Sequence, residues 1–554
     1  MNNFDYLIAA IFILFVIGLG MSLARTGRNM KDFFAAGGAV PWWISGLSLF
    51  MSFFSVGTFV VWGAIAYSDG FVSISIQATM ALSGLVVALL IGPAWNRTGC
   101  LTVAEYIQKR LGKIPQKLYS GIFIIISLFT TGAFLYPVGK IIEVTTGLDL
   151  ETAIMLLGVL IIIYTALGGL WAVLVTDVLQ FVVLSAAVLL VIPLAFEHIG
   201  GVDQFVSNLP AGFTELHNEK YDLLFLVGFF IYNAVFIGGN WAYVQRYTSV
   251  SNPKDAKKVG LLFAGLYLIA PIIWMLPPMI YRIIAPDVSG TDAEDAYLLV
   301  SKTVLPNGLL GLILGAMVFA TASSVNTTIN IVSGVITNDL FKALRPKSSQ
   351  KKLMLVARLS TVAFGLVAIF VALSIKSFGG IVETVLSVAA LTGVPIFLPP
   401  IWSLFSKFQN AVSILSATVF SLLANLFFKF LAPSLLQIEL SRGQEMLFGV
   451  LTPVLILAGF EIFLRKTKPD SSVDFSATPV VETAQEDPQE NNDSSYGKKV
   501  ISIGVLGIGS LITVLGVLAD KGTAITLTIG VTITLIAVIS LYSISKKRRL
   551  SAHE

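Results

Sequence analysis

The stretch PWWISGLSLFMSFFSVGTFVVWGAIA, residues 41–66, is apolar over a length sufficient to cross a lipid bilayer. Its middle, from Ser48 to Thr58, is rich in small and hydroxyl-bearing residues. Membrane transporters bind their cargo where helices are broken near the bilayer midplane, because the freed backbone carbonyls can coordinate a cation there. We therefore predict that this run is an interrupted membrane helix.

Similar apolar runs make up most of the chain. Of the 554 residues, 56% are hydrophobic and only 12% are charged, whereas soluble domains carry about 25% charged residues. The runs are long and continuous, which favours helices over the strands of a membrane barrel. We predict an all-α polytopic membrane protein with about 15 transmembrane helices. They lie near residues 6–24, 41–66, 71–95, 117–146, 152–173, 175–197, 222–245, 258–284, 308–338, 354–375, 381–405, 409–432, 445–464, 500–519 and 523–544.

The composition also argues against several functions. The net charge is only +4 and the basic residues are dispersed over short loops, so no nucleic-acid partner is expected. Cys100 is the only cysteine, which excludes an internal disulfide and a cysteine-based zinc site. There is no Walker-type phosphate-binding motif and no convincing nucleophile–base pair. We expect neither an enzyme, nor an organic cofactor, nor a transition metal.

The distribution of charge predicts the orientation. Basic residues follow the first, third, seventh and ninth runs, whereas acidic residues follow the sixth and eighth. Because basic loops stay on the cytoplasmic side, the N-terminus is expected outside and the C-terminus inside. The predicted location is the plasma (inner) membrane.

A second interrupted helix is predicted near residues 222–245, where Gly238, Gly239 and Asn240 follow one another. Two interrupted helices separated in this way indicate an inverted repeat of two five-helix units, about 41–198 and about 222–405. Glycine could equally permit close helix packing. The body would span residues 1–465, followed by a polar cytoplasmic linker, 466–499, and a two-helix appendage with a basic tail, 500–554.

The run near 308–338 contains ATASSVNTTIN, residues 320–330, a dense row of hydroxyl and amide groups. Sodium is a hard cation that prefers oxygen ligands, and adjacent hydroxyls beside a broken helix would supply them. Alternatively, these side chains only hydrogen-bond to the backbone and hold helices together.

These residues, with NDLFK at 338–342, resemble the signature helix of the sodium/solute symporter family, whose members include sodium:glucose cotransporters. Residues 164–172 (YTALGGLWA), 176–180 (TDVLQ), 32–43 (DFFAAGGAVPWW) and 245–246 (QR) resemble other motifs of the family. The resemblance covers roughly residues 1–465. It implies a five-plus-five inverted-repeat (LeuT-like) core preceded by one extra helix. It also implies sodium-coupled import of a small organic solute by alternating access.

The resemblance further implies a sodium site. Its ligands would be the carbonyls of Met51, Phe54 and Ala320 and the side chains of Ser323 and Ser324. Asp177 matches an acidic position along the inner sodium path, although it could instead cap the start of its own helix.

The resemblance also implies candidate solute-binding residues. Positions that are polar in sugar-carrying relatives align with Thr58, Gln77, Asn240 and Ala389, and the alanine does not favour a sugar. Lys140, inside the run 117–146, could bind a carboxylate of the solute. We expect instead that it pairs with Glu143, three residues on, near the outer end of the helix.

The solute, whether sugar, sialic acid, amino acid or carboxylate, and the oligomeric state stay open at this point. A different class of function is a membrane sensor that uses a transporter-like body and signals through its C-terminal extension.

Overall fold

The computed structural model describes residues 2–22, 40–54, 56–100, 102–167, 170–288, 290–375, 381–467 and 488–550. Within the described helices, some side chains lie outside the description, namely those of residues 17, 20, 21, 163–167, 170–172, 290, 291, 323, 343, 381–390, 488–495 and 547–550. The described ranges contain helices and no strand, which confirms the all-α fold class.

The first five-helix unit follows the N-terminal helix α1 (Asn3–Ser22). It comprises α3 (Trp42–Phe53), η2 (Thr58–Trp62), α4 (Gly63–Asp69), α5 (Val72–Val86), η3 (Val87–Ile91), α6 (Gly92–Arg97), α7 (Val103–Leu111), α8 (Lys113–Thr146), α9 (Leu150–Leu167) and α10 (Leu170–Ile199).

The second unit follows the short helix α11 (Val202–Ser207). It comprises α12 (Leu223–Gly239), α13 (Trp241–Thr248), α14 (Pro253–Trp274), α15 (Leu276–Ile284), η4 (Gly290–Asp295), α16 (Ala296–Val304), α17 (Leu309–Gly334), η5 (Val335–Phe341), α18 (Lys342–Leu344), α19 (Gln350–Ser374) and α20 (Ile381–Phe405). The C-terminal part contains α21 (Ala411–Leu426), η7 (Phe427–Leu431), α22 (Ala432–Leu436), α23 (Arg442–Thr467), α24 (Pro488–Leu518) and α25 (Thr523–Leu550).

Within the described residues, 10 helices are long and apolar enough to cross a membrane, or up to 12 when each bent helix pair counts as one span. Three further apolar helices, Asn3–Val16, Leu150–Ile162 and Leu391–Phe405, are shorter. The membrane-protein class is confirmed, whereas the number fifteen stays a prediction.

Both predicted interruptions are present. The axis bends by 58° between α3 and η2–α4, and by 58° between α12 and α13. Beside each bend a described residue leaves the helical conformation: Phe54 has φ −100° and ψ 96°, and Asn240 has φ −61° and ψ 128°. An extended residue ends the ladder of backbone hydrogen bonds, so carbonyls near it are released from the helix.

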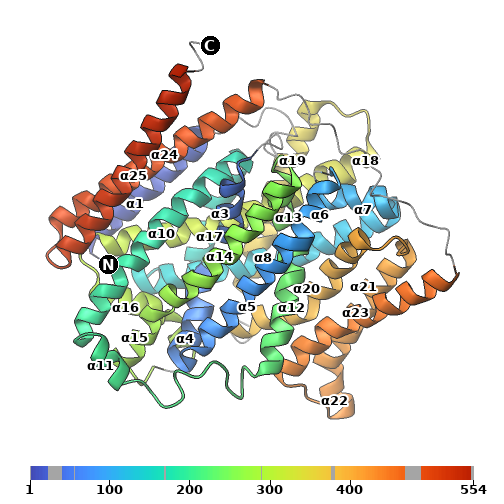
Figure 1. Cartoon of the computed structure of the whole chain (residues 1–554), viewed down its shortest axis with the longest axis horizontal. Helices are drawn as coiled ribbons and strands as arrows, with labels where there is room; N and C mark the ends of the chain where they lie inside the picture. The colour runs from blue at the N-terminus through green and yellow to red at the C-terminus, as the bar shows by residue number, and fades with distance from the viewer. Residues whose placement is uncertain are drawn as a thin grey trace.

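Helix α17 lies in the middle of the molecule. It contacts α1, α3, α8, α10 and α19, and Figure 1 shows it surrounded by these helices. The most apolar window of α17 is 100% buried, whereas that of α25, at the edge of the molecule, is 17% buried. The hydroxyl row of residues 320–330 is therefore in the core and not on a lipid-facing surface.

The segment expected to be a linker is partly helical. Helix α23 continues to Thr467 and α24 begins at Pro488, while residues 468–487 lie outside the described ranges. Helix α24 contacts α10 and α1 as well as α25. A Cβ atom added to Gly504 of α24 would lie 2.4 Å from the side chain of Leu179 in α10. Helix α24 therefore packs directly on α10, because glycine lets the two helices approach closely. The division of the chain into a body, a linker and an appendage stays a prediction.

Candidate functional site

The break between α3 and η2 is held against α17. The backbone N–H of Val56 donates a hydrogen bond to Oγ1 of Thr321, over 3.0 Å. The hydroxyl of Thr58 donates to the carbonyl of Phe53 over 2.8 Å, which bridges the break itself. The chain interruption thus lies beside the hydroxyl row of α17, as the sequence predicted.

Four of the five expected sodium-site residues fall within the described side chains. Met51, Phe54, Ala320 and Ser324 are all buried, and the hydroxyl of Ser324 donates to the carbonyl of Ala320 over 3.4 Å. The side chain of the fifth, Ser323, lies outside the described residues. The hydrogen bond from Val56 to Thr321 brings the two contributing segments together, and the ligand set itself stays a prediction.

Asp177 does not cap a helix. Helix α10 begins at Leu170, so Asp177 lies about two turns inside it, beyond the first-turn N–H groups that a cap would accept from. Its carboxylate instead accepts a hydrogen bond from the Ser48 hydroxyl at 2.5 Å and lies 3.9 Å from Nη2 of Arg246. The capping alternative was wrong.

Arg246, on α13, connects this carboxylate to two other helices, α3 and α17. Its guanidinium is fully buried and donates to Oγ of Ser48 at 3.2 Å, to Oγ1 of Thr327 at 3.2 Å and to the carbonyl of Ala242 at 2.9 Å. A buried charge needs this kind of pairing to be tolerated. The network therefore ties α10 and α13 to both halves of the candidate sodium site.

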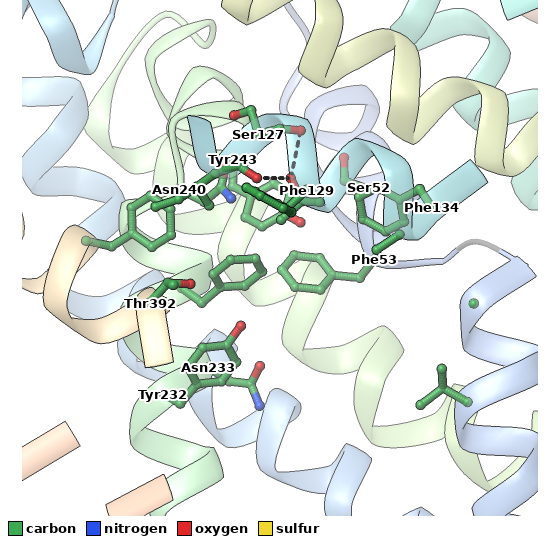
Figure 2. Close-up of a pocket in the computed structure, with 18 of the residues that line it drawn as sticks. Ser52, Phe53, Ser127, Phe129, Phe134, Tyr232, Asn233, Asn240, Tyr243 and Thr392 are labelled. Carbon is green, nitrogen blue, oxygen red and sulfur yellow. Dashed lines mark hydrogen bonds between the residues drawn. The ribbon is translucent and has the colours of Figure 1, made fainter. Parts of the chain in front are cut away.

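A cavity of about 490 Å³ opens beside the break. Figure 2 shows side chains of α3, α8, α12, α13 and α20 gathered around it. Its volume is within the range of about 300–1,000 Å³ that is typical of small-molecule sites. Aromatic side chains are the most numerous class along its described lining, ahead of the aliphatic class and of the polar class taken separately. The polar lining residues are Ser52, Thr58, Ser127, Thr130, Asn233, Asn240, Ser374 and Thr392.

Two of the predicted solute-binding residues, Thr58 and Asn240, line this cavity. The side-chain oxygen of Asn240 accepts a hydrogen bond from Ala242 N–H over 3.0 Å, so it also caps α13. Gln77 is buried but is not part of the lining, and its amide donates to the carbonyl of Ser73. The side chain of Ala389 lies outside the described residues.

Lys140 does not line the cavity, and its carboxylate partner differs from the expected one. Its ammonium lies 3.2 Å from the carboxylate of Glu294 in η4, and the two side chains are only 16% and 8% exposed. The expected partner was Glu143, on the same helix. The prediction was wrong because Glu294 of η4, which is remote in sequence, supplies the carboxylate.

Sequence reasoning missed Asn233 and its aromatic neighbours. Phe229, Tyr232, Asn233, Phe236 and Asn240 all line the cavity. Their spacing of three, one, three and four residues places them on one face of α12 and its break. An amide in an aromatic stripe of helical period, leading to a broken-helix residue, was the signal that could have identified this wall.

Comparison with known proteins agrees with this architecture. Residues 33–420 match the sequence pattern of the sodium:solute symporter family. The chain is 26% identical to the sodium/glucose cotransporter of Vibrio parahaemolyticus over 82% of its own length and 89% of that protein. It is 30% identical to sodium/myo-inositol cotransporter 2 of Rattus norvegicus over 67% of its own length, but spans only 61% of that protein.

A solved structure supports the fold. The substrate-bound outward-open structure of a Na⁺-coupled sialic acid symporter superposes with a TM-score of 0.71 at 22% identity, over 83% of this chain and 98% of that one. This chain thus combines two broken helices and a central α17 with the sequence pattern of the sodium:solute symporter family. The chain therefore belongs to the sodium:solute symporter family, and it is a sodium-coupled membrane transporter and not an enzyme.

Proposed function

We propose that sodium binds between the α3–η2 break and α17, at Met51, Phe54, Ala320, Ser323 and Ser324, and that the solute binds in the adjacent cavity. The observation that carries this proposal is the hydrogen bond from Val56 to Thr321, which fastens the break beside the hydroxyl row. Carbonyls at a helix break and hydroxyls of a facing helix are suitable oxygen ligands for sodium.

The two sites share one segment of chain, which explains how binding could be coupled. Ser52, Phe53, Gly57 and Thr58 line the cavity. The first two lie between the predicted sodium ligands Met51 and Phe54, and the other two follow the break. An ion that orders this segment also orders one wall of the cavity. Because coupling is reciprocal, sodium should raise the affinity for solute and solute should raise the affinity for sodium by the same factor.

Entry of sodium provides the energy for uptake. One sodium ion crossing 100 mV releases about 2.3 kcal/mol, and a tenfold gradient adds about 1.4 kcal/mol. Together they support an accumulation of the solute of a few hundredfold. We propose that Asp177, in its network with Ser48 and Arg246, lies on the path by which sodium leaves toward the cytoplasm.

We further propose that the N-terminus faces the outside and the C-terminus the cytoplasm of a plasma (inner) membrane. In a Cys100→Ser background, a membrane-impermeant maleimide should label Asn3→Cys in intact cells. It should label Ser545→Cys only after the cells are permeabilised. The reverse pattern would contradict the orientation.

The sodium assignment is tested without knowledge of the solute. Purified full-length protein in nanodiscs should bind radioactive sodium, and Ser324→Ala should weaken that binding. Ser333→Ala is a matched control, because Ser333 is also buried on α17 but donates to the carbonyl of Ala357 in α19. Equal sodium affinity in Ser324→Ala and wild type would remove Ser324 from the site.

A further inference from the structure

An ion pair joins two walls of the cavity beyond its outer end. Along α8 the described lining runs from Phe123 to Pro137, and Lys140 lies about one helical turn further toward Thr146. The Lys140 ammonium lies 3.2 Å from the carboxylate of Glu294 in η4. In the proposed orientation the Thr146 end of α8 is the outer end, so this pair lies on the outer side of the cavity.

The segment that carries Glu294 rests on another wall of the cavity. Element η4 contacts η2, and Thr58 and Trp62 of η2 line the cavity. In α16, which follows η4, the ring of Tyr297 lies 4.3 Å from the ring of Phe59 in η2. The ion pair therefore links α8, on one side of the cavity, to a segment that is seated on η2.

The apolar contact beneath η4 is small. Ala293 and Ala296 pack with Ala64 and Tyr67 of α4 in a cluster that is separate from the main core. Burial of few apolar atoms holds a segment only weakly, and segments of this kind open locally without global unfolding. Breaking the ion pair to α8 would therefore free η4 to move while the helices beneath it stay folded.

Asp295, next to Glu294, is buried beside this pair. It is 9% exposed, and its Oδ1 atom has no hydrogen-bond partner among the described residues. A buried carboxylate without partners is more easily tolerated when it is protonated. Burial, opposed by Lys140 and reinforced by Glu294, raises the pKa of this carboxyl to about 6 from the usual 3.8. Movement of η4 into water would return the pKa toward its usual value.

The other groups around Asp295 leave Lys140 as its cation. Lys140 is the only cation among the described groups that act on Asp295. Element η2 has no titratable side chain, Tyr67 of α4 donates to the carbonyl of Ala285, and Asp69 of α4 accepts from Asn218. The titratable side chains of the elements around Asp295 are Lys140 and Glu143 of α8, Asp292 and Glu294 of η4, Tyr67 and Asp69 of α4, and Tyr297 and the exposed Lys302 of α16.

We propose that the Lys140–Glu294 pair is a latch that holds η4 across the outer end of the cavity, and that an extracellular proton bound by Asp295 keeps this latch closed. The proposal rests on the proposed function, because it takes the cavity to be the solute site and the Thr146 end of α8 to be outside. The latch controls access to the cavity and not the contacts within it. It should therefore change the rate of solute exchange more than the affinity, since a ligand that binds both forms equally shifts neither.

A reporter cysteine measures access to the cavity. In a Cys100→Ser background, Ala133→Cys places a thiol on α8, in the lining of the cavity. The rate at which a membrane-impermeant maleimide labels this thiol in intact cells reports how often the latch opens. Each rate is divided by that of Asn3→Cys, an exposed position, in the same background and at the same pH. This division removes the pH dependence of the thiol reaction itself.

The pair is removed with Lys140→Met/Glu294→Gln, which leaves no unpaired buried charge. We expect labelling to become at least about fivefold faster, because the open form is more populated. Lys140→Glu/Glu294→Lys, which reverses the pair, should restore most of the slow labelling. The matched control is Lys429→Met/Glu445→Gln, because this part-buried pair joins η7 to α23 outside the described lining of the cavity. It should label at the parent rate.

The role of Asp295 is tested by pH. Between about pH 7 and about pH 5 the divided rate of the parent should fall by about tenfold, because the closed form binds a proton that the open form releases. Asp295→Asn resembles the protonated residue, so it should label slowly at both pH values. Asp292→Asn, exposed and in the same element, should keep the pH dependence of the parent.

The outcomes separate the latch from the proposed function. A Lys140→Met/Glu294→Gln protein that binds radioactive sodium but labels at the parent rate would overturn the latch, and so would equally fast labelling in the Lys429→Met/Glu445→Gln control. If the first variant does not fold, Lys140→Gln/Glu294→Gln takes its place.

A parent rate that does not change with pH, or a tenfold fall that persists in Asp295→Asn, would overturn the role of Asp295. The labelling rates require no sodium. A wild-type protein that binds no radioactive sodium would therefore overturn the proposed sodium site, while the same labelling pattern would still support the latch.

Discussion

Ser323 and Ser324 would supply the two side-chain oxygens of the proposed sodium site, and the remaining ligands are backbone carbonyls that no substitution removes. We expect Ser323→Ala/Ser324→Ala to abolish sodium-driven uptake and to lower the affinity for solute at fixed sodium, through the reciprocity of the two sites. Radioactive sodium binding and melting temperature, measured on the same nanodisc sample, separate loss of the ion from loss of the fold. A double variant with wild-type sodium affinity would refute the site.

Lys140 and Glu294 form a nearly buried ion pair between α8 and η4. Removing one partner leaves an unpaired buried charge, so Lys140→Met should lower the free energy of unfolding by about 3–5 kcal/mol. Lys140→Met/Glu294→Gln should recover most of that loss, while Lys140→Met/Glu143→Gln should not. Melting curves of the wild type, these three variants and Glu294→Gln complete the double-mutant cycle for Lys140 and Glu294. Solute affinity should change by less than about threefold in Lys140→Met, because Lys140 does not line the cavity. A tenfold loss would instead indicate a direct contact between Lys140 and the solute.

Asp295, next to this pair in η4, makes stability depend on pH. Burial, opposed by Lys140 and reinforced by Glu294, raises the pKa of its carboxyl to about 6 from the usual 3.8. The folded protein therefore holds a proton that the unfolded chain releases, and stability should fall as the pH rises from about 4 to about 6. Asp295→Asn should remove this dependence and raise the melting temperature at neutral pH. Asp292→Asn, an exposed residue of the same helix, is the control.

At the scale of secondary-structure elements, close packing of α14 on α5 and η3 joins the two five-helix units. A Cβ atom at Gly260 would lie 2.7 Å from the Cα atom of Ala88, whereas one at Gly265, on the same helix, would meet nothing within 4 Å. Gly260→Ala should thus destabilise the protein by about 1–3 kcal/mol, because backbone atoms must move apart. Gly265→Ala should be neutral or slightly stabilising, since alanine favours the helix. Equal melting temperatures of the two variants would show that this contact is looser than described.

At the scale of the whole molecule, the C-terminal helices support the body without forming its sites. The described lining of the cavity and the sodium candidates belong to α3, η2, α5, α8, α12, α13, α14, α17, α19 and α20 and to the residues at the helix breaks. Deleting residues 498–554 should therefore leave sodium binding largely intact. It should lower the melting temperature, because Leu179 loses its contact with Gly504 and Phe15 loses its contact with Gly507.

A milder variant isolates the contact between α24 and α10. Gly504→Leu forces α24 away from Leu179 while the chain remains complete. It should reproduce part of the loss of stability that we expect on truncation, with unchanged sodium affinity. A truncated protein that reaches the membrane but binds no sodium would contradict the view that these helices lie outside the functional core.

Much of the architecture was readable from the sequence. Apolar runs must become helices in a bilayer, because every backbone polar group has to be satisfied within its own segment. The two interruptions were visible as well, since Ser48–Thr58 and Gly238–Asn240 place residues that weaken or break a helix in the middle of long apolar runs. These are local properties, set by side-chain chemistry within a few turns.

Which residues face one another was decided only by the tertiary structure. Glu294 is remote from Lys140 in sequence and Ser48 is remote from Asp177, and no periodicity relates the members of either pair. Asn233 looked like one more residue of an apolar helix until the cavity formed beside it. Local sequence determines whether a segment is a helix and where it breaks. The partner of a buried charge and the lining of a cavity depend instead on how helices from distant parts of the chain pack.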